Sequence, residues 1–247
     1  MNLGLAGRTA IVGGASSGMG LAIAEALAGE GANVVMFARR RELLEREAAR
    51  IGALPVCGDL TDPESLERLA SSAVEAHGGV DVLVLNGGGP PPGPAVGLDA
   101  SQVEEAVALL LLPHVRLVDL CLPHLRAGGR GRIVAVESTS VKEPLPNLAL
   151  SNAVRPGVVG WLRTLARELG PDGVTVNTIA PGRIDTDRFR QVYPDGLTEA
   201  DRQLIPLRRV GTPAEVGAVA CFLASDAAAY VTGTTIAVDG GLTRGLT

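Results

Sequence analysis

The chain has 247 residues, of which 46% are hydrophobic and 2% aromatic, and its formal net charge is -5 at pH 7. This length allows one large core of Ala, Val, Leu and Ile, and no Pro-, Gly- or Ser-rich linker divides the chain, so we expect a single domain over residues 1–247. The net negative charge and the lack of a basic run give no positively charged surface that could bind nucleic acid, so we do not expect nucleic acid as a partner.

Membrane and metal-binding classes are also disfavoured. The longest apolar run, residues 106–112, is too short to cross a bilayer, and the N-terminus lacks a charged region followed by an apolar secretion signal. We therefore expect a soluble cytoplasmic protein. Cys57, Cys121 and Cys221 are scattered without a C-x-x-C or His pairing, which indicates small buried side chains rather than metal ligands.

The first predicted unit is a strand, a glycine turn and a helix. Residues 10–12 are apolar, a glycine-rich turn follows, and residues 21–27 have an apolar helical pattern. A second apolar run, residues 34–37, completes a parallel crossover unit. Similar helical patterns alternate with short apolar strands along the whole chain, which predicts a doubly wound α/β sheet.

The turn has the spacing Gly14-x-x-x-Gly18-x-Gly20. Gly14 and Gly18 would let the backbone approach a pyrophosphate, and Gly20 would let the helix pack closely on the strand. Free N–H groups at the helix start would then face the anion. The alternative is a glycine-rich loop that binds nothing.

This spacing resembles the Thr-Gly-x-x-x-Gly-x-Gly turn of the short-chain dehydrogenase/reductase family, with Gly13 where the family usually has Thr. The resemblance runs from Leu5 to about Leu242 and is nearest to the 3-oxoacyl-acyl-carrier-protein reductase branch. It implies a Rossmann-type sheet with helices on both faces and a dinucleotide cofactor. It also places Ser16, Ser17 and Met19 against that cofactor.

The second strand is followed by basic residues. A bare ribose is usually held at this point by an acidic side chain, whereas Arg can pair with a 2'-phosphate. Arg39 and Arg40 stand here, and no acid precedes Glu42, so we expect NADP(H) in preference to NAD(H). NAD(H) stays an alternative, because Ser17 stands where many NADP-preferring relatives have a basic residue and the arginines could be a solvated helix start.

The third strand, near residues 55–57, leads into Asp59 and Leu60. Asp59 resembles the family residue that binds the adenine amino group, and Leu60 lies beside it. Asp59 could instead be a turn or cap acid. The residues after it, 61–63, are typical of a capped helix start with a first-turn proline.

The fourth strand, residues 80–85, is apolar throughout and is followed by Asn86, Gly87 and Gly88. The family has Asn-Asn-Ala-Gly at this point, so the resemblance places these three residues under the ribose and nicotinamide. Leu85 replaces the first Asn of that motif. Residues 88–94 predict a stiff loop flanking a substrate entrance.

Two helical stretches, residues 101–112 and 115–125, follow and are expected to kink at Pro113. In the family this is one long helix with an Asn that holds a proton-relay water. The position of that Asn corresponds to about Leu110, whose apolar side chain cannot hold a water molecule by hydrogen bonds.

The catalytic residues of the family are only partly present. Ser138, after the strand of residues 131–136, matches the family's catalytic serine, whose hydroxyl hydrogen-bonds the substrate oxygen. The Tyr-x-x-x-Lys pair falls on Ser151 and Arg155. An unperturbed phenol has a pKa of about 10 and a neighbouring cation can lower it, but an aliphatic hydroxyl is far less acidic. Arg155 could still hold the nicotinamide ribose, although its planar fork is not a Lys substitute.

A different proton donor is then needed. His114, about one turn after Leu110, and Glu143, in the loop after Ser138, are the candidates, and each could equally be structural or exposed. Proline destabilises the interior of a helix but is favourable at its first position. We therefore expect the next helix to begin near Pro156 and to cover residues 156–169.

The last third of the chain also follows the family. A strand at residues 174–179 leads into Pro181, Gly182, Ile184 and Thr186, which the resemblance places against the nicotinamide amide and a phosphate. The polar, arginine-rich residues 187–210 predict a substrate lid.

Two hypotheses follow from different classes, with a lyase or isomerase using the same pocket as a weaker third. The first is an NADP(H)-dependent oxidoreductase that reduces a carbonyl, such as a 3-oxoacyl thioester, or oxidises the matching alcohol of a small-molecule substrate. The second is a cofactor-binding pseudoenzyme that acts as a sensor or oligomer partner. Relatives suggest a homo-oligomer, a tetramer or dimer.

Overall fold

The computed structural model describes residues 2–245, and at its centre is a seven-stranded parallel sheet in the order β3-β2-β1-β4-β5-β6-β7. The strands are β1 Thr9–Gly13, β2 Asn33–Ala38, β3 Leu54–Cys57, β4 Val82–Leu85, β5 Arg132–Val136, β6 Thr175–Pro181 and β7 Thr235–Val238. This topology confirms the predicted doubly wound α/β fold.

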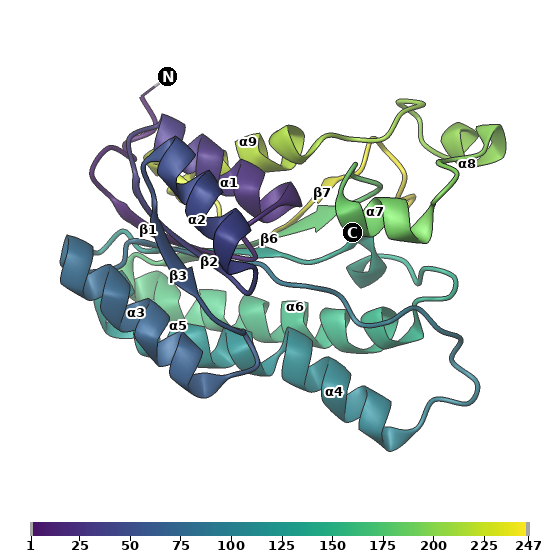
Figure 1. Cartoon of the computed structure of the whole chain (residues 1–247), viewed down its shortest axis with the longest axis horizontal. Coiled ribbons are helices and arrows are strands. Elements are labelled where there is room, and N and C mark those ends of the chain that lie inside the picture. The colour runs from purple at the N-terminus through teal and green to yellow at the C-terminus, as the bar shows by residue number, and fades with distance from the viewer. Residues whose placement is uncertain (1, 246–247) are drawn as a thin grey trace.

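Helices cover both faces of the sheet (Figure 1). They are α1 Gly18–Gly29, α2 Arg41–Ile51, α3 Pro63–His77, α4 Ala100–Leu110, α5 Leu112–Ala127, α6 Ala149–Leu169, α7 Asp187–Val192, α8 Glu199–Gln203 and α9 Pro213–Ala224. α1, α2 and α9 lie on one face, and α3, α4, α5 and α6 lie on the other.

Alternate side chains of each central strand enter two different cores. In β1, Ile11 packs in the core under α3, α5 and α6, whereas Ala10 and Val12 pack in the core under α1 and α9. Every residue of β1 is buried. The continuous apolar runs in the sequence therefore reflect strands covered on both faces.

The expected helix start near Pro156 is wrong, because α6 begins at Ala149 and contains Pro156 in its interior. The backbone N–H of Asn152 already donates to the Leu148 carbonyl at 2.9 Å. A proline inside a helix costs about 3 kcal/mol. Leu150 and Val154 precede the proline on the buried face of the helix, and burying such side chains contributes roughly 1.5–3 kcal/mol each. Packing thus outweighs the proline, and Ser151 and Arg155 stand one turn apart on one helix.

The kink expected at Pro113 is found as an interruption between two helices. α4 ends at Leu110, Leu111 has φ −108° and ψ −54°, and Pro113 occupies the first turn of α5. Residues Ala100–Ala127 together are long and apolar enough to cross a membrane by length and composition, a test that core helices of soluble proteins also pass. In this fold α4 packs on α6 and α5 packs on α3.

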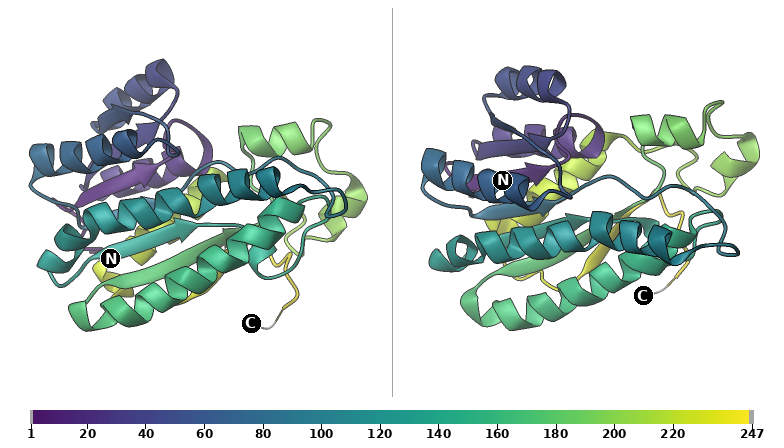
Figure 2. Two further views of the ribbon diagram at one scale, coloured as in Figure 1. Left: turned by 90° about the horizontal axis from the view of Figure 1, so that it is seen from below. Right: turned by 60° about the horizontal axis from the view of Figure 1, so that its bottom comes forward.

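The segment expected to form a lid, residues 187–210, contains the two short helices α7 and α8. Both views of Figure 2 show these helices at one end of the molecule, apart from the two helical layers. The side chain of Arg188, on α7, donates to the Pro90 carbonyl at 2.9 Å. This contact joins the segment to the proline-rich loop after β4.

Candidate cofactor and active site

The glycine turn leaves bare backbone at the carboxyl end of β1. Gly14 and Gly18 both have φ +59°, which favours glycine, and a Cβ at Gly20 would stand 2.3 Å from the Gly14 carbonyl oxygen. Ser17 is the N-cap of α1, and within residues 2–245 no side chain caps the helix N-terminus. The first N–H groups of α1 are therefore free to bind an anion.

Asn86 joins this turn to the end of β4. Its side-chain amide is buried and donates to the Gly13 carbonyl at 2.8 Å. A Cβ at Gly13 would lie 2.5 Å from the Asn86 carbonyl oxygen, so in this structure β1 and β4 approach too closely for a side chain at position 13. β1 and β4 are the strands at which the strand order reverses, and ligands of doubly wound sheets bind at that point.

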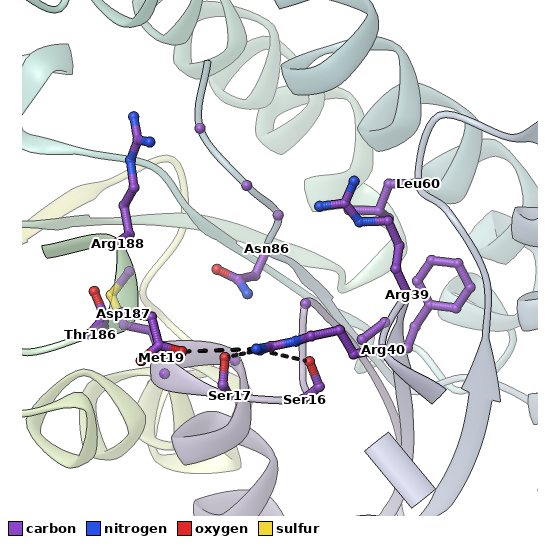
Figure 3. Close-up of a pocket in the computed structure, with 18 of the residues that line it drawn as sticks. Ser16, Ser17, Met19, Arg39, Arg40, Leu60, Asn86, Thr186, Asp187 and Arg188 are labelled. Atoms are coloured by element: carbon purple, nitrogen blue, oxygen red, sulfur yellow. Dashed lines mark hydrogen bonds and ion pairs between the residues drawn. The ribbon is translucent and has the colours of Figure 1, made fainter. Parts of the chain in front are cut away.

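A cavity of about 690 Å³ opens at this edge of the sheet (Figure 3). Most of the predicted cofactor residues line it, namely Gly14, Ser16, Ser17, Gly18, Met19, Gly20, Arg39, Arg40, Asp59, Leu60, Asn86, Gly87, Gly88 and Thr186. Arg188 and Gln191 of α7 also line it. The volume lies in the range of small-molecule and cofactor sites.

Four predicted cofactor residues do not form this wall, and one of them, Arg155, belongs to the polar cluster described below. Pro181 pairs with Val238 in the sheet, and a Cβ at Gly182 would meet the Cβ of Asp239 at 2.6 Å. The side chain of Ile184 is buried, and its strand-like pairing is with Gly211. In this structure the other three residues shape the turn after β6, and their contacts with a cofactor stay predictions.

Two of the three arginines that line the cavity directly follow β2, and the third is Arg188 of α7. Arg40 donates to the hydroxyls of Ser17 at 2.5 Å and Ser16 at 3.3 Å, as Figure 3 shows. Arg39 lies 3.7 Å from the Asp59 carboxylate. Hydrogen bonds from Thr61, and also the Arg39 charge, lower the pKa of Asp59, so this carboxylate is ionised at neutral pH.

A second polar cluster lies where β5 ends against α6. The Ser138 hydroxyl accepts from the Ser140 N–H at 3.1 Å, and the hydroxyls of Ser140 and Ser151 are 3.1 Å apart. Arg155 donates through Nη2 to the Gly88 carbonyl at 3.4 Å, which links this cluster to the wall of the cavity. Hydrogen bonds therefore connect Ser138 to Ser151 through Ser140, and Arg155 stands one turn after Ser151 on α6. The expected helix start near Pro156 would not have placed Ser151 and Arg155 in this way.

The two candidate replacement acids differ in position. Glu143 accepts from the backbone N–H groups of Arg244 and Gly245 near the C-terminus. His114 is buried and lies 3.8 Å from Glu137, and its pKa is lowered to about 3 by burial and by the charge of Arg155.

Glu137, like Arg188 and Gln191 of the cavity wall, is a residue that sequence reasoning missed. Its side chain is fully buried and accepts from Arg155 Nη1 at 2.9 Å. Burial raises the pKa of Glu137, and Arg155 opposes that shift. The available signal was a charged residue directly after an apolar strand. Among the described residues, no group of three or more His, Cys, Asp and Glu side chains could hold a metal ion.

Known proteins share this whole architecture. A family model described as enoyl-(acyl carrier protein) reductase matches residues 14–243. The 3-oxoacyl-[acyl-carrier-protein] reductase MabA of Mycobacterium tuberculosis is 35% identical over 238 residues, covering 96% of this chain and 94% of that protein. Dehydrogenase/reductase SDR family member 4 of Sus scrofa is 34% identical over 247 residues, covering 96% and 88%. This chain belongs to the short-chain dehydrogenase/reductase family.

Solved short-chain dehydrogenase/reductase structures superimpose on nearly the whole chain. YwfH, an NADPH-dependent reductase involved in bacilysin biosynthesis, has a TM-score of 0.93 at 27% identity and covers 97% of this chain and 99% of its own. The L-sorbose reductase of Gluconobacter frateurii, in complex with NADPH and L-sorbose, has a TM-score of 0.92 at 30% identity with 100% of both chains covered.

Proposed function

We propose that this protein is an NADP(H)-dependent reductase of a small carbonyl compound, with a proton donor other than the family's tyrosine. The observation that carries the proposal is the cavity at the strand-order reversal, with the uncapped α1 N-terminus at its base and Arg39 and Arg40 on its wall. Relatives that are named as reductases of 3-oxoacyl-[acyl-carrier-protein] and L-sorbose support the reaction class.

The residues of the cavity fit a phosphorylated dinucleotide. The N–H groups at the start of α1 would bind its pyrophosphate, and Arg39 and Arg40 would pair with a 2'-phosphate. The lack of a side chain at Gly18 leaves room for the pyrophosphate. A Cβ at this position would stand 3.3 Å from Thr186 and would fill the space between the turn and that residue. When bound, the nicotinamide supplies a hydride.

The polar cluster beside the cavity would act on the substrate. Ser138 would donate a hydrogen bond to the substrate oxygen. Arg155, which lies against the Gly88 carbonyl, would hold the nicotinamide ribose by donating to its hydroxyls. Ser151 is bonded to Ser140 and is too weak an acid to replace a phenol.

The first experiment is a fluorescence titration of the purified protein with NADPH and, in parallel, with NADH. We expect micromolar binding of NADPH and much weaker binding of NADH. Equal binding of both would contradict the role of Arg39 and Arg40, and NAD(H) would become the cofactor. Binding of neither would overturn the oxidoreductase proposal.

A pseudoenzyme is the second candidate, favoured by the absence of the Tyr and Lys side chains at positions 151 and 155. Because α6 is continuous here, these positions keep one-turn spacing, so restoring the pair is informative. We expect the double variant S151Y/R155K to reduce 3-oxoacyl thioesters or another carbonyl of a test panel faster than the wild type. A matched S151F/R155K variant, which lacks only the phenol hydroxyl, should show no gain. Wild-type turnover would exclude the pseudoenzyme.

We also propose that the chain forms a homo-oligomer and that residues 187–210 act as the substrate lid. Apolar side chains on α4 and α5 are partly exposed, among them Val103, Leu112 and Val115, and Tyr230 is fully exposed. Light scattering after size-exclusion chromatography would detect a dimer or tetramer, and a monomer would contradict this assignment.

A further inference from the structure

Three ionisable side chains from three different elements meet beside the cavity. Glu137 directly follows β5, Arg155 lies on α6, and His114 lies on α5. Their side chains are only 0%, 10% and 5% exposed. Ionisable groups buried to this degree need partners, since an unpaired buried charge is strongly unfavourable.

Both oxygens of Glu137 are directed at this cluster. Oε2 accepts from Arg155 Nη1 at 2.9 Å, whereas Oε1 faces His114 Nδ1 at 3.8 Å. Within residues 2–245, Oε1 and Nδ1 are both buried and neither has a hydrogen-bond partner. Each is therefore the available partner of the other, and a side-chain adjustment of less than 1 Å would bring them to hydrogen-bond distance.

Arg155 connects this carboxylate to the wall of the cavity. Its Nη1 is bonded to Glu137, and its Nη2 reaches the Gly88 carbonyl at 3.4 Å. Two fixed points on one planar guanidinium define its orientation, because the donors of a guanidinium form a rigid fork. Without the carboxylate, the Gly88 contact alone would leave the guanidinium free to rotate and its charge unpaired.

The state of His114 follows from the same contacts. Burial and the charge of Arg155 lower the pKa of His114 to about 3, so the imidazole is neutral at pH 7. A neutral imidazole carries one N–H, and a carboxylate accepts hydrogen bonds but does not donate them. The ion pair with Arg155 at 2.9 Å favours the ionised form of Glu137 against the effect of burial. With Glu137 as a carboxylate, the nitrogen that faces it is the protonated one.

We propose that Glu137 is a positioning residue of this active site, which fixes the guanidinium of Arg155 against the cofactor loop and holds His114 as the neutral Nδ1–H tautomer. The part of this inference that concerns cofactor binding rests on the proposed function. His114 is then a neutral partner of Glu137 rather than the missing proton donor.

The histidine part is tested by nitrogen NMR of the wild-type protein. The chain has three histidines, so the variants H77Q and H124Q assign the His114 signals by elimination. We expect His114 to keep the Nδ1–H tautomer from about pH 5.5 to about pH 8.5, whereas an unperturbed histidine titrates near 6.5. In the variant E137Q the amide NH₂ group would donate to Nδ1, so we expect a switch to the Nε2–H tautomer. An Nε2–H form in the wild type, or a titration near 6.5, would overturn the proposal.

The arginine part is tested by a double-mutant cycle on the dissociation constant of NADPH. We expect E137Q and R155M each to weaken NADPH binding roughly tenfold, because each removes the charge-assisted contact that orients the guanidinium. The double variant should bind no more weakly than R155M alone, since Glu137 acts through Arg155. The variant D172N, which breaks the exposed Arg126–Asp172 pair, is the control and should leave binding unchanged.

Additive effects of E137Q and R155M on NADPH binding would contradict a role through Arg155. Circular dichroism checks that the variants are folded, and if E137Q does not fold, the tautomer of His114 in the wild type decides the proposal. If the wild type binds no NADPH, the proposed function fails, whereas the tautomer measurement still tests the carboxylate contact.

Discussion

The guanidinium of Arg40 lies 2.5 Å from the hydroxyl of Ser17 and 4.0 Å from the carboxylate of Asp187. Ser17 is the N-cap of α1, and Asp187 is the first residue of α7. Arg40 therefore joins the glycine turn and the first helix of the proposed lid across the rim of the cavity, as Figure 3 shows.

Replacement of the two cavity arginines that follow β2 should remove the preference for NADPH. In the variant R39Q/R40Q we expect the dissociation constant of NADPH to rise on the order of 10- to 100-fold, since the loss of two charged partners of a phosphate costs roughly 1.5–3 kcal/mol. Binding of NADH should change little. The control is R41Q, which changes the next arginine along the chain, because Arg41 pairs with Glu45 on the surface of α2. An equal loss for both cofactors would contradict the assignment of the 2'-phosphate site.

The glycine at position 20 should be irreplaceable, while another glycine of the same helix should not be. A Cβ at Gly20 would lie 2.3 Å from backbone oxygen, so we expect G20A to lose NADPH binding and to unfold at lower temperature. At Gly29 no atom lies within 4 Å of an added Cβ, so G29A should be neutral or stabilising by about 0.5 kcal/mol. Thermal unfolding and NADPH titration of both variants check this. A G20A protein with normal binding would refute the close approach.

The proline inside α6 should reduce stability. Pro156 is exposed and cannot donate to the Asn152 carbonyl four residues earlier, so P156A restores a backbone hydrogen bond without opening a cavity. We expect the free energy of unfolding to increase by about 1–2 kcal/mol. This is less than the full cost of an interior proline, because the unfolded chain with alanine has more conformational entropy than the unfolded chain with proline. The control is P213A, since Pro213 begins α9, where proline is favourable and its loss should destabilise slightly. Urea unfolding would measure both, and a lower stability of P156A would contradict the regular helix.

The capping box of α9 should lose its stabilising effect in acid. Hydrogen bonds from the Arg209 guanidinium, and then from the Thr212 backbone N–H, lower the pKa of Glu215 to about 2. An unfolded Glu has a pKa of about 4.3, so the contribution of the carboxylate is complete above that value and is lost as the pH falls toward 2. Glu215 is on the surface, so salt should weaken the effect.

The variant E215Q tests this pH dependence. Its melting temperature should lie below that of the wild type at pH 7, and the difference should shrink as the pH approaches 2. The matched variant E104Q, which changes an exposed acid of α4, should show no such change in the difference. A difference that is constant with pH would show that Glu215 does not act as an ionised cap.

The sequence alone determined the order of the elements and much of the wall of the cavity. Local patterns carry this information, because the glycines at positions 14, 18 and 20 have conformations or close contacts that a side chain would disturb. The cap of α9 by Thr212 and Glu215 could be predicted for the same reason, since its partners lie within four residues. The loss of Tyr and Lys at positions 151 and 155 was also visible.

Only the tertiary structure decided the position of the charges beside the cavity. α6 begins before Pro156 because burial of the apolar face of the helix stabilises it by more than the proline destabilises it. Local sequence rules do not include this tertiary packing energy. Glu137, His114 and Arg155 are far apart in sequence and meet because β5, α5 and α6 pack together. Glu143 contacts the C-terminal segment, a pairing across 101 residues. Such contacts follow from packing of the whole chain, which no short window of sequence specifies.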